Sequence, residues 1–351
     1  MLTDMRIYLK MQNRESLCFD DLLLVPQFSD IESRKEIDIG NTLSDVSFAM
    51  PIISAPMDTV TETAMANTMC KYGGLGIIHR YNTIEEQTKL VRRSVRGNKT
   101  ENVAAAIGVT GDFLERAIEL TKAGAKFICV DVAHGHHSMM RYALEVLKNT
   151  LGDASHIMAG NVATLKGFND LADWGADSVR VGIGGGSICS TRIQTGHGIP
   201  TLQSVIDCAQ TNRNAKIVAD GGIKNSGDIV KALAAGADFV ILGSLLAGTT
   251  QSPGEVFYKN GYKLRTYRGM ASAEAQKDWR GVASSLEGVS TSIPFKGHAG
   301  DILNNLKRGI RSGLSYSGAR NLTELRAKSQ FIKQTNASQL ESNTHIVTRY
   351  K

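Results

Sequence analysis

Eight short runs of almost continuously apolar residues recur along this chain, and their repetition constrains the fold more than any other feature of the sequence. The runs are rich in Val, Ile, Ala and Gly, which is typical of strands that are buried on both faces of a parallel sheet. The eight candidate strands are residues 50–54, 76–79, 103–109, 127–133, 156–161, 178–183, 216–220 and 239–243.

The segments between these runs have the spacing of amphipathic helices. In 113–122 and in 229–235, the apolar side chains gather on one side of a helix. Three helices are expected to end at Gly124, Gly175 and Gly236, because glycine readily takes the left-handed conformation that ends a helix. Eight parallel strands with alternating helices predict an α/β protein that closes as a (β/α)8 TIM barrel. An open, doubly wound sheet is the alternative.

Polar and glycine-rich residues follow the predicted strands, at the end where barrel enzymes carry their chemistry. After the eighth strand, residues 245–300 show no clear periodicity, and we interpret this long segment as a flap over the barrel. A last amphipathic helix is expected at 301–312. No second domain is visible between the strands, so residues 1–351 are predicted to form a single barrel domain with its flap at about 245–300.

Charge and composition narrow the class of ligand. The net charge is +6, but the basic residues are scattered, which favours a small anionic ligand over a nucleic acid. No apolar stretch is long enough to span a bilayer and residues 1–4 do not resemble the start of a secretory signal, so we expect a cytoplasmic protein without a membrane partner. The five cysteines are an odd number without CxxC spacing, which disfavours a disulfide framework and a zinc site.

A glycine-rich loop over residues 182–192 surrounds Cys189 and carries the sharpest chemical signal. Glycines let the backbone approach a ligand closely. Cys189 follows a predicted strand, with the hydroxyl of Thr191 and the charge of Arg192 nearby in sequence. A thiol in such a setting is a candidate nucleophile. The alternative interpretation is a flexible loop that contains an inert thiol.

Glycine turns follow the last two predicted strands. They are Asp220-Gly221-Gly222 and Gly243-Ser244, and barrels commonly bind phosphate at these two loops through backbone N–H groups. The carboxylate of Asp220 would repel a phosphate, so we expect it to accept hydrogen bonds from sugar hydroxyls. The alternative is that these loops are only tight turns.

Residues 131–137 place a carboxylate and three imidazoles at the end of another strand. His134 and His136 could bind a metal, but the pattern lacks the further ligands of a typical zinc site. We therefore interpret Asp131 as a contact to cofactor or substrate. No GxGxxG follows the first strand, so a nicotinamide cofactor is not expected to bind in the Rossmann manner.

Taken in order, these motifs resemble the IMP dehydrogenase/GMP reductase family over nearly the whole chain. The resemblance implies a barrel in which a cysteine thiolate attacks C2 of a purine nucleotide and forms a covalent thioimidate. A dehydrogenase then passes hydride to NAD and hydrolyses the adduct to XMP, whereas a reductase expels ammonia from GMP and accepts hydride from NADPH to give IMP. The matching segments are 19–22, 54–59, 131–135, 159–162, 184–191, 219–223, 242–244, 267–270 and 294–297.

Four features resemble the reductase branch. No CBS modules are inserted between the strands, and residues 33–38 and 191–198 read like reductase segments. In the flap, a dehydrogenase carries an Arg-Tyr pair that activates water, whereas this chain has Trp279-Arg280. A hydrolytic step without a positioned base would be slower by about 10² to 10⁴.

Three features resemble the dehydrogenase branch instead. Arg180 stands where reductases usually have lysine, Met57 follows Ala-Pro, and residues 337–347 read like a dehydrogenase ending. The sequence therefore favours GMP reductase and keeps two alternatives: an IMP dehydrogenase without CBS modules that uses NAD, and a catalytically inactive regulator that binds purine nucleotides. It does not decide between NADPH and NADH or between ribo- and deoxyribonucleotides.

The resemblance also assigns roles to individual residues. It implies that Cys189 is the nucleophile, that Thr191 and Glu287 transfer protons, and that the enzyme is a homotetramer. The implied nucleotide contacts are Met57, Ser187, Asp220, Gly221, Gly222, Gly243, Ser244, Gly269 and Met270. The implied cofactor contacts are Asp131, Val132, Ala133, Arg80, Ser33 and Arg34, with Tyr316, Ser317, Gly318 and Ala319 reaching the cofactor of a neighbouring subunit. The implied potassium site consists of Gly184, Gly186, Cys189 and Arg192.

Overall fold

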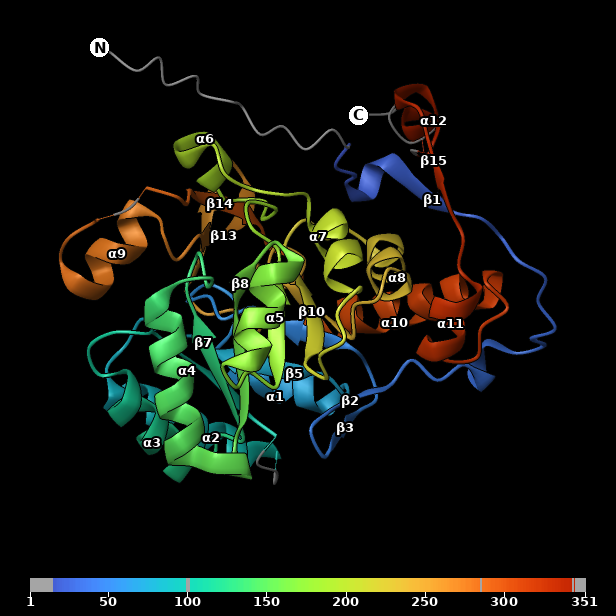
Figure 1. Ribbon diagram of the computed structural model, residues 1–351. Helices are drawn as coiled ribbons and strands as arrows, with labels where there is room; N and C mark the ends of the chain where they lie inside the picture. Colours follow the sequence, from blue (N-terminus) through green and yellow to red (C-terminus); the bar gives the residue numbers. More distant parts are fainter. Residues whose placement is uncertain (1–14, 99–101, 285, 343, 345–351) are drawn as a thin grey trace, which may run out of the picture.

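A closed barrel of eight parallel strands forms the centre of the computed structural model, which describes residues 15–98, 102–284, 286–342 and 344 (Figure 1). The strands follow one another around the barrel in chain order, and the last pairs with the first. This confirms the predicted (β/α)8 architecture and excludes the open sheet. The barrel strands are β4 (Ile52–Ser54), β5 (Leu75–Ile78), β6 (Ala104–Ile107), β7 (Phe127–Asp131), β8 (His156–Val162), β9 (Ser178–Val181), β10 (Lys216–Asp220) and β11 (Phe239–Leu242).

Helices cover the outside of the barrel, each between two strands or after the last one. Gly236, which ends α8 with a positive φ of 117°, lies so close to Ala209 that a side-chain carbon there would stand 2.5 Å from the Ala209 Cβ. Gly124 and Gly175 also have positive φ, as predicted. The helices are α1 (Thr63–Lys71), α2 (Ile84–Asn98), α3 (Phe113–Lys122), α4 (Ser138–Leu151), α5 (Leu165–Asp173), α7 (Thr201–Cys208), α8 (Ser226–Ala234) and α10 (Ala299–Tyr316).

A β-hairpin closes the amino end of the barrel, and the sequence analysis did not predict it. It consists of β2 (Asn41–Leu43) and β3 (Val46–Phe48). The Phe48 ring lies 5.8 Å from that of Phe127 and 5.7 Å from that of Phe239, between centroids, at the first residues of β7 and β11. Burial of these rings closes this end, so the opening to ligands lies at the opposite, carboxyl end.

The hairpin is also held by His156, whose side chain is buried at the start of β8. Its Nδ1 lies 2.8 Å from the Ser44 Oγ and its Nε2 lies 2.8 Å from the Ser178 Oγ. Burial disfavours the imidazolium and lowers the pKa of His156 to about 4. The neutral ring therefore connects the hairpin to the barrel wall.

We expect the free energy of unfolding to fall as the pH drops from 6.5 towards 4. In this range the unfolded chain binds a proton at His156 that the folded chain does not bind, so stability rises with pH by up to about 1.4 kcal/mol per pH unit. Urea unfolding at several pH values measures this effect, with His156→Asn as the comparison. Equal pH dependence of the wild type and the variant between pH 4 and 6.5 would show that His156 is not responsible.

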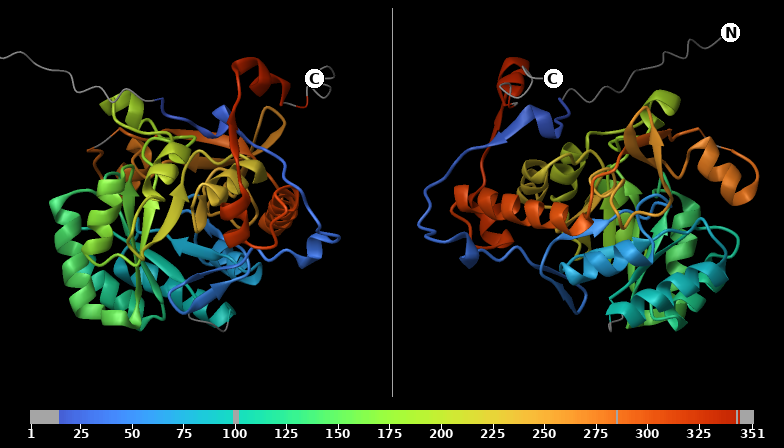
Figure 2. Two further views of the ribbon diagram at one scale, coloured as in Figure 1. Left: turned by 45° about the vertical axis from the view of Figure 1, so that its right-hand side comes forward. Right: turned by 180° about the vertical axis from the view of Figure 1, so that it is seen from behind.

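The flap has more secondary structure than its sequence indicated. It contains β12 (Val256–Lys259), β13 (Tyr262–Arg268) and β14 (Ser290–Pro294), which form an antiparallel sheet, and α9 (Ala273–Arg280). These strands gave no clear periodicity in the sequence, because antiparallel pairing stabilises strands whose own apolar pattern is weak. The flap sheet and the β2–β3 hairpin lie at opposite ends of the barrel (Figures 1 and 2).

The remaining elements lie beside the barrel. The predicted last helix begins earlier and ends later than expected, as α10. The part of the chain that the structure describes holds no helix long and apolar enough to cross a membrane; residues 1–4, which bear on the expected absence of a signal, lie outside it. The further elements are η1 (Phe19–Asp21), β1 (Leu22–Leu24), η2 (Arg34–Glu36), η3 (Gly152–Ala154), α6 (Thr191–Thr195), α11 (Leu322–Lys328), β15 (Phe331–Lys333) and α12 (Asn336–Glu341).

Candidate active site

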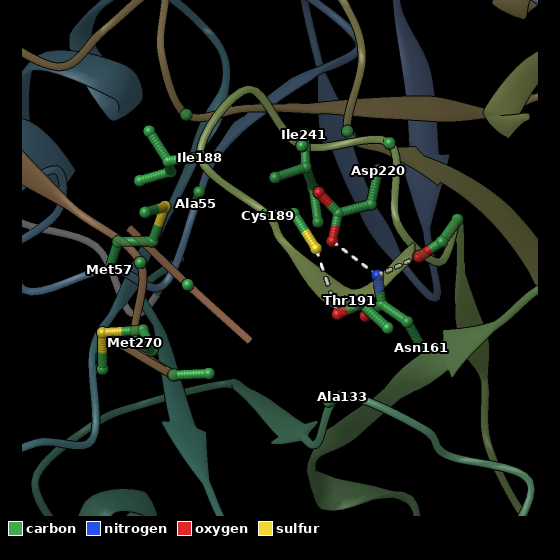
Figure 3. Close-up of a pocket in the computed structure, with 18 of the residues that line it drawn as sticks. Ala55, Met57, Ala133, Asn161, Ile188, Cys189, Thr191, Asp220, Ile241 and Met270 are labelled. Atoms are coloured by element: carbon green, nitrogen blue, oxygen red, sulfur yellow. Dashed lines mark hydrogen bonds between the residues drawn. The ribbon is translucent and has the colours of Figure 1, made fainter. Parts of the chain in front are cut away.

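A cavity of about 310 Å³ opens at the carboxyl ends of the barrel strands. Residues at or just after the carboxyl end of every barrel strand except β6 line it, and the flap adds the segments around Tyr267 and Glu287. Met57, Met270 and Ile188 lie on one side of this cavity, and Asp220 and Asn161 lie on the other (Figure 3). The predicted residues that line it are Arg80, Met57, Asp131, Val132, Ala133, Gly184, Gly186, Ser187, Cys189, Thr191, Asp220, Gly221, Gly222, Gly243, Ser244, Gly269, Met270 and Glu287.

A hydrogen-bonded chain connects the three predicted catalytic residues. The Cys189 thiol donates to the Thr191 Oγ1 at 3.2 Å (Figure 3). The Thr191 hydroxyl donates in turn to the Glu287 Oε2 at 2.9 Å. The thiol thus lies one hydroxyl away from a carboxylate. This arrangement can move a proton between the cavity and the carboxylate while the sulfur reacts.

The backbone of the flap pairs directly with the backbone of the cysteine loop. The Ser190 N–H donates to the Glu287 carbonyl and the Val289 N–H donates to the Ile188 carbonyl, both at 3.0 Å, around a bridge between Cys189 and Gly288. Glu287 and Cys189 come from distant parts of the sequence. Their relative position is therefore fixed by main-chain hydrogen bonds as well as by Thr191.

Glycines allow the cysteine loop to pack against the loop after β10. Gly182 has φ of 144°, and a side-chain carbon built there would lie 2.0 Å from the Asp220 carbonyl oxygen. Gly221 has φ of 91° and a carbon there would lie 3.1 Å from the Gly186 nitrogen. Both positions favour glycine because of their backbone conformation and because of the space. The two predicted ligand loops thus form one wall of the cavity.

A buried guanidinium connects two carboxylates at the base of the cavity. Arg180 on β9 pairs through Nη1 with the Asp131 Oδ1 at 2.5 Å and through Nη2 with the Asp220 Oδ2 at 2.8 Å. The Arg80 Nε also lies 3.5 Å from the Asp131 Oδ2. Burial opposes ionisation of Asp131, but the charges of Arg180 and Arg80 outweigh it and lower the pKa of this carboxyl.

The Asp220 carboxylate uses only one of its oxygens for these contacts. Its Oδ2 accepts from the Nε and Nη2 of Arg180 at 3.2 and 2.8 Å and from the Asn161 Nδ2 at 2.9 Å. Its Oδ1 has no hydrogen-bond partner among the described residues. Because Asp220 lines the cavity, this oxygen suits the predicted role of accepting from sugar hydroxyls.

The sequence analysis missed several residues of the cavity. Tyr267 is buried, its hydroxyl lies 3.5 Å from the Ser187 Oγ, and burial raises the pKa of its phenol. Tyr81 lines the cavity and its hydroxyl donates to the Met270 carbonyl at 2.7 Å. Tyr267 lies within a segment that carried the family resemblance, which was a usable signal. Asn161, which also lies in such a segment, and Arg180, which was noted only as a difference from reductases, line the cavity as well, although neither was predicted as a site residue.

Some predicted site residues lie elsewhere. Ser33 and Arg34 lie at η2. Tyr316 is the last residue of α10, Ser317, Gly318 and Ala319 follow it, and the Gln27 N–H donates to the Tyr316 carbonyl at 2.9 Å. None of them lines the cavity of this chain. The contact of Tyr316, Ser317, Gly318 and Ala319 with the cofactor of a neighbouring subunit stays a prediction.

Two of the three histidines in 131–137 have partners outside the cavity. The His136 Nε2 pairs with the Asp170 Oδ2 at 2.7 Å, and the His137 side chain accepts from the Met139 N–H at the start of α4. Within the described ranges, no three His, Cys, Asp or Glu side chains gather so that they could hold a metal ion. Cys129 is buried beside Arg180, and its burial raises the pKa of the thiol to about 11, which leaves Cys189 as the thiol that lines the cavity.

Comparison with known proteins places these residues in a family. A family model described as "IMP dehydrogenase / GMP reductase domain" matches residues 16–345. The chain is 34% identical to the inosine-5'-monophosphate dehydrogenase of Nitrosopumilus maritimus, with 96% of this chain and 99% of the relative covered. It is 31% identical to the GMP reductase of Leishmania major, with 95% and 98% covered.

A solved structure shows the same fold. A GMP reductase of Trypanosoma brucei, a cysteine-to-alanine variant in complex with guanosine 5'-monophosphate, superposes with a TM-score of 0.90 at 29% identity, with 95% of this chain and 98% of that chain covered. The sequence alignments to the dehydrogenase of N. maritimus and the reductase of L. major extend over 474 and 480 positions, more than the 351 residues of this chain. Both relatives therefore carry additional residues, so the shorter length of this chain does not separate the two activities. The protein belongs to the IMP dehydrogenase/GMP reductase family, whose members are oxidoreductases that use nicotinamide dinucleotides.

Proposed function

We propose that this protein is a GMP reductase, which converts GMP to IMP and ammonia with NADPH through a thioimidate on Cys189. The observation that carries the proposal is the chain from the Cys189 thiol through Thr191 to Glu287, which lies in the cavity. It supplies a nucleophile and a proton donor for a departing amine. The related T. brucei reductase, solved with GMP, supports a guanine nucleotide as the ligand.

The position of the flap favours the reductase over the dehydrogenase. The Trp279 ring stacks on the Tyr81 ring at 4.3 Å between centroids. The Arg280 guanidinium donates to the Val282 carbonyl at 3.2 Å and to the side chains of Gln276 and Ser284. Neither Trp279 nor Arg280 lines the cavity, so this part of the flap offers no base to activate water at the adduct.

Arg80 and Tyr81 are adjacent in sequence, both line the cavity, and both are held by other contacts. Arg80 pairs with Asp131, and the Tyr81 hydroxyl donates to the Met270 carbonyl. A base must be able to accept a proton from the attacking water. Because these contacts hold Arg80 and Tyr81, the two side chains serve in binding and packing and not as a base.

The proposed reaction has two parts. First, the thiol proton passes through Thr191 to Glu287 and the Cys189 sulfur bonds to C2 of guanine; the exocyclic amine takes protons and leaves as ammonia, so the C–N bond breaks and a thioimidate remains. Second, C2 gains a hydride and the C–S bond breaks, which releases IMP and the thiolate. The sum is GMP, NADPH and two protons to IMP, NADP⁺ and ammonium.

The residues present fit a nicotinamide dinucleotide beside the nucleotide. NADPH supplies the hydride when it is bound, and Asp131, Val132, Ala133 and Arg80, which line the cavity near Asn161, would hold it. Cys189 lies in the same cavity, so the reacting ends of the nucleotide and the dinucleotide would meet there.

The cysteine loop presents backbone carbonyl oxygens, which are the groups that bind potassium, so its chemistry fits a monovalent cation. The Gly186 carbonyl accepts from the Cys189 N–H and the Arg192 carbonyl accepts from the Gly196 N–H, both at 3.1 Å, so each oxygen keeps a second lone pair for a cation. Gly184 lies beside the Arg192 side chain. We propose that potassium binds to carbonyls of this loop, while the Arg192 guanidinium, itself a cation, does not ligate it.

One assay tests the proposed activity. GMP and IMP are each combined with NADPH, NADH, NADP⁺ and NAD⁺, and the reduced dinucleotide is followed by its absorbance. We expect oxidation of NADPH with GMP and release of ammonia. Reduction of NAD⁺ with IMP alone would identify a dehydrogenase, and nucleotide binding without turnover in any combination would identify the inactive regulator. Light scattering after size exclusion tests the proposed homotetramer in the same preparation.

A further inference from the structure

One charged side chain touches both ligand-binding carboxylates of the cavity. Arg180 is 7% exposed, and Asp131 and Asp220 are each 16% exposed. Asp131 ends β7 and Asp220 ends β10, whereas Arg180 lies on β9, between β8 and β10 in the barrel. The guanidinium therefore bridges strands that do not pair with each other.

These two carboxylates serve different ligands under the proposed function, on which the following inference rests. Asp220 faces the nucleotide sugar and Asp131 faces the dinucleotide. We propose that Arg180 is a positioning residue that sets both carboxylates at once, so that the nucleotide and the dinucleotide depend on the same guanidinium for binding. Arg180 acts on each ligand through Asp131 or Asp220.

The hydrogen bonds on Asp220 show what the guanidinium fixes there. Three donors from Arg180 and Asn161 converge on the Oδ2, and the Oδ1 is left for the cavity. A carboxylate rotates about its last bond unless one oxygen is held. The planar fork of an arginine holds it in one orientation.

Arg80 provides a comparison within the same cavity. Its Nε lies 3.5 Å from the Asp131 Oδ2, and its guanidinium lies over the rings of Tyr81 and Trp279. It has no contact with Asp220 among the described interactions. The structure therefore assigns Arg80 to the dinucleotide side alone, whereas Arg180 contacts both sides.

The experiment measures binding of each ligand separately by titration calorimetry, so that turnover is not needed. The main variant is Arg180→Lys, which keeps the charge but replaces a planar fork by a single ammonium. We expect the dissociation constants of GMP and of NADP⁺ both to rise at least about tenfold. Arg80→Lys should raise that of NADP⁺ alone. Arg213→Lys, which alters an arginine paired with Asp173 outside the cavity, is the matched control and should change neither.

A second comparison serves if Arg180→Lys does not fold. Asp220→Asn should weaken GMP and leave NADP⁺ binding unchanged, because Asp131 keeps both arginines. The double variant Arg180→Met with Asp220→Asn loses one positive and one negative charge, so its net charge equals that of the wild type. The ion pair between Arg80 and Asp131 remains in it. This double variant should bind NADP⁺ at least about tenfold more weakly than Asp220→Asn does.

Several outcomes would overturn the inference. One is a lower melting temperature of Arg180→Lys with both dissociation constants unchanged, which is the result for a merely structural arginine. Another is equal NADP⁺ binding by Asp220→Asn and the double variant. If the wild type binds IMP and NAD⁺ in place of GMP and NADP⁺, the proposed function fails, and the same variants test Arg180 with those ligands. A wild type that binds no dinucleotide overturns both proposals.

Discussion

Cys189→Ala is expected to abolish turnover, with kcat lower by on the order of 10⁴ to 10⁶, while GMP still binds. The Cys189 sulfur is the only atom of this side chain that can form the bond to C2, and its loss leaves no covalent route. The alanine removes one sulfur from the edge of the cavity and leaves the contacts of Asp220, Ser187 and Tyr267 in place. NADPH consumption measures kcat, and titration calorimetry measures GMP binding.

The matched control is Cys70→Ala, because Cys70 is a partly buried, free cysteine on α1 that does not line the cavity. It should retain the activity of the wild type. Mass spectrometry of wild type quenched with GMP should show an adduct at Cys189. Residual turnover of Cys189→Ala above about one hundredth of the wild-type value would contradict covalent catalysis by this thiol.

Glu287→Gln is expected to lower kcat by about 10² to 10⁴, the usual contribution of a positioned acid or base. Glutamine can still accept the hydrogen bond from Thr191, so the loop and the flap should keep their pairing. It cannot take the thiol proton or return one to the departing amine. Rapid-quench measurement of ammonia release in a single turnover reports this step directly.

The effect should fall on ammonia release more than on substrate binding, so KM for GMP should change little. Glu274→Gln provides the control, since Glu274 is an exposed carboxylate on α9 of the same flap. Thr191→Val should resemble Glu287→Gln, and the double variant should lose little more than either single variant, because both residues serve one proton path. Additive losses would show that Thr191 and Glu287 act independently.

The barrel could be predicted from sequence because its strands are buried on both faces. A run such as 127–131 is apolar at almost every position, which differs visibly from the amphipathic helices around it. Cys189 and Thr191, the proposed catalytic residues, were predictable for a related reason. They lie in one short loop, and its many glycines, which permit close packing, are visible in the sequence.

The β2–β3 hairpin and the flap sheet could not be predicted in the same way. Phe48 packs on Phe127 and Phe239, which are far away in sequence, and no local pattern indicates such a contact. The flap strands are short and partly exposed, so their apolar alternation is weak, and cross-strand pairing decides their structure.

The role of Arg180 was missed for a different reason. In the sequence it is one basic residue inside an apolar strand, and only the closed barrel brings it to Asp131 and Asp220. Both acids were predicted to contact ligands, but nothing in the local pattern connects one to the other. Contacts between charged residues on different strands of a barrel depend on the tertiary structure, so a local sequence pattern does not indicate them.

The pairing of the flap with the cysteine loop has a consequence for inhibitor design. The main chain around Glu287 and Gly288 is hydrogen-bonded to the main chain around Cys189, so these two stretches form one small sheet-like unit. Under the proposed mechanism, a compound that inserts between them would separate the Cys189 sulfur from the Glu287 carboxylate and stop the reaction without occupying the proposed purine site. Such an inhibitor would not compete with nucleotides for the proposed purine site, unlike an inhibitor that mimics the substrate.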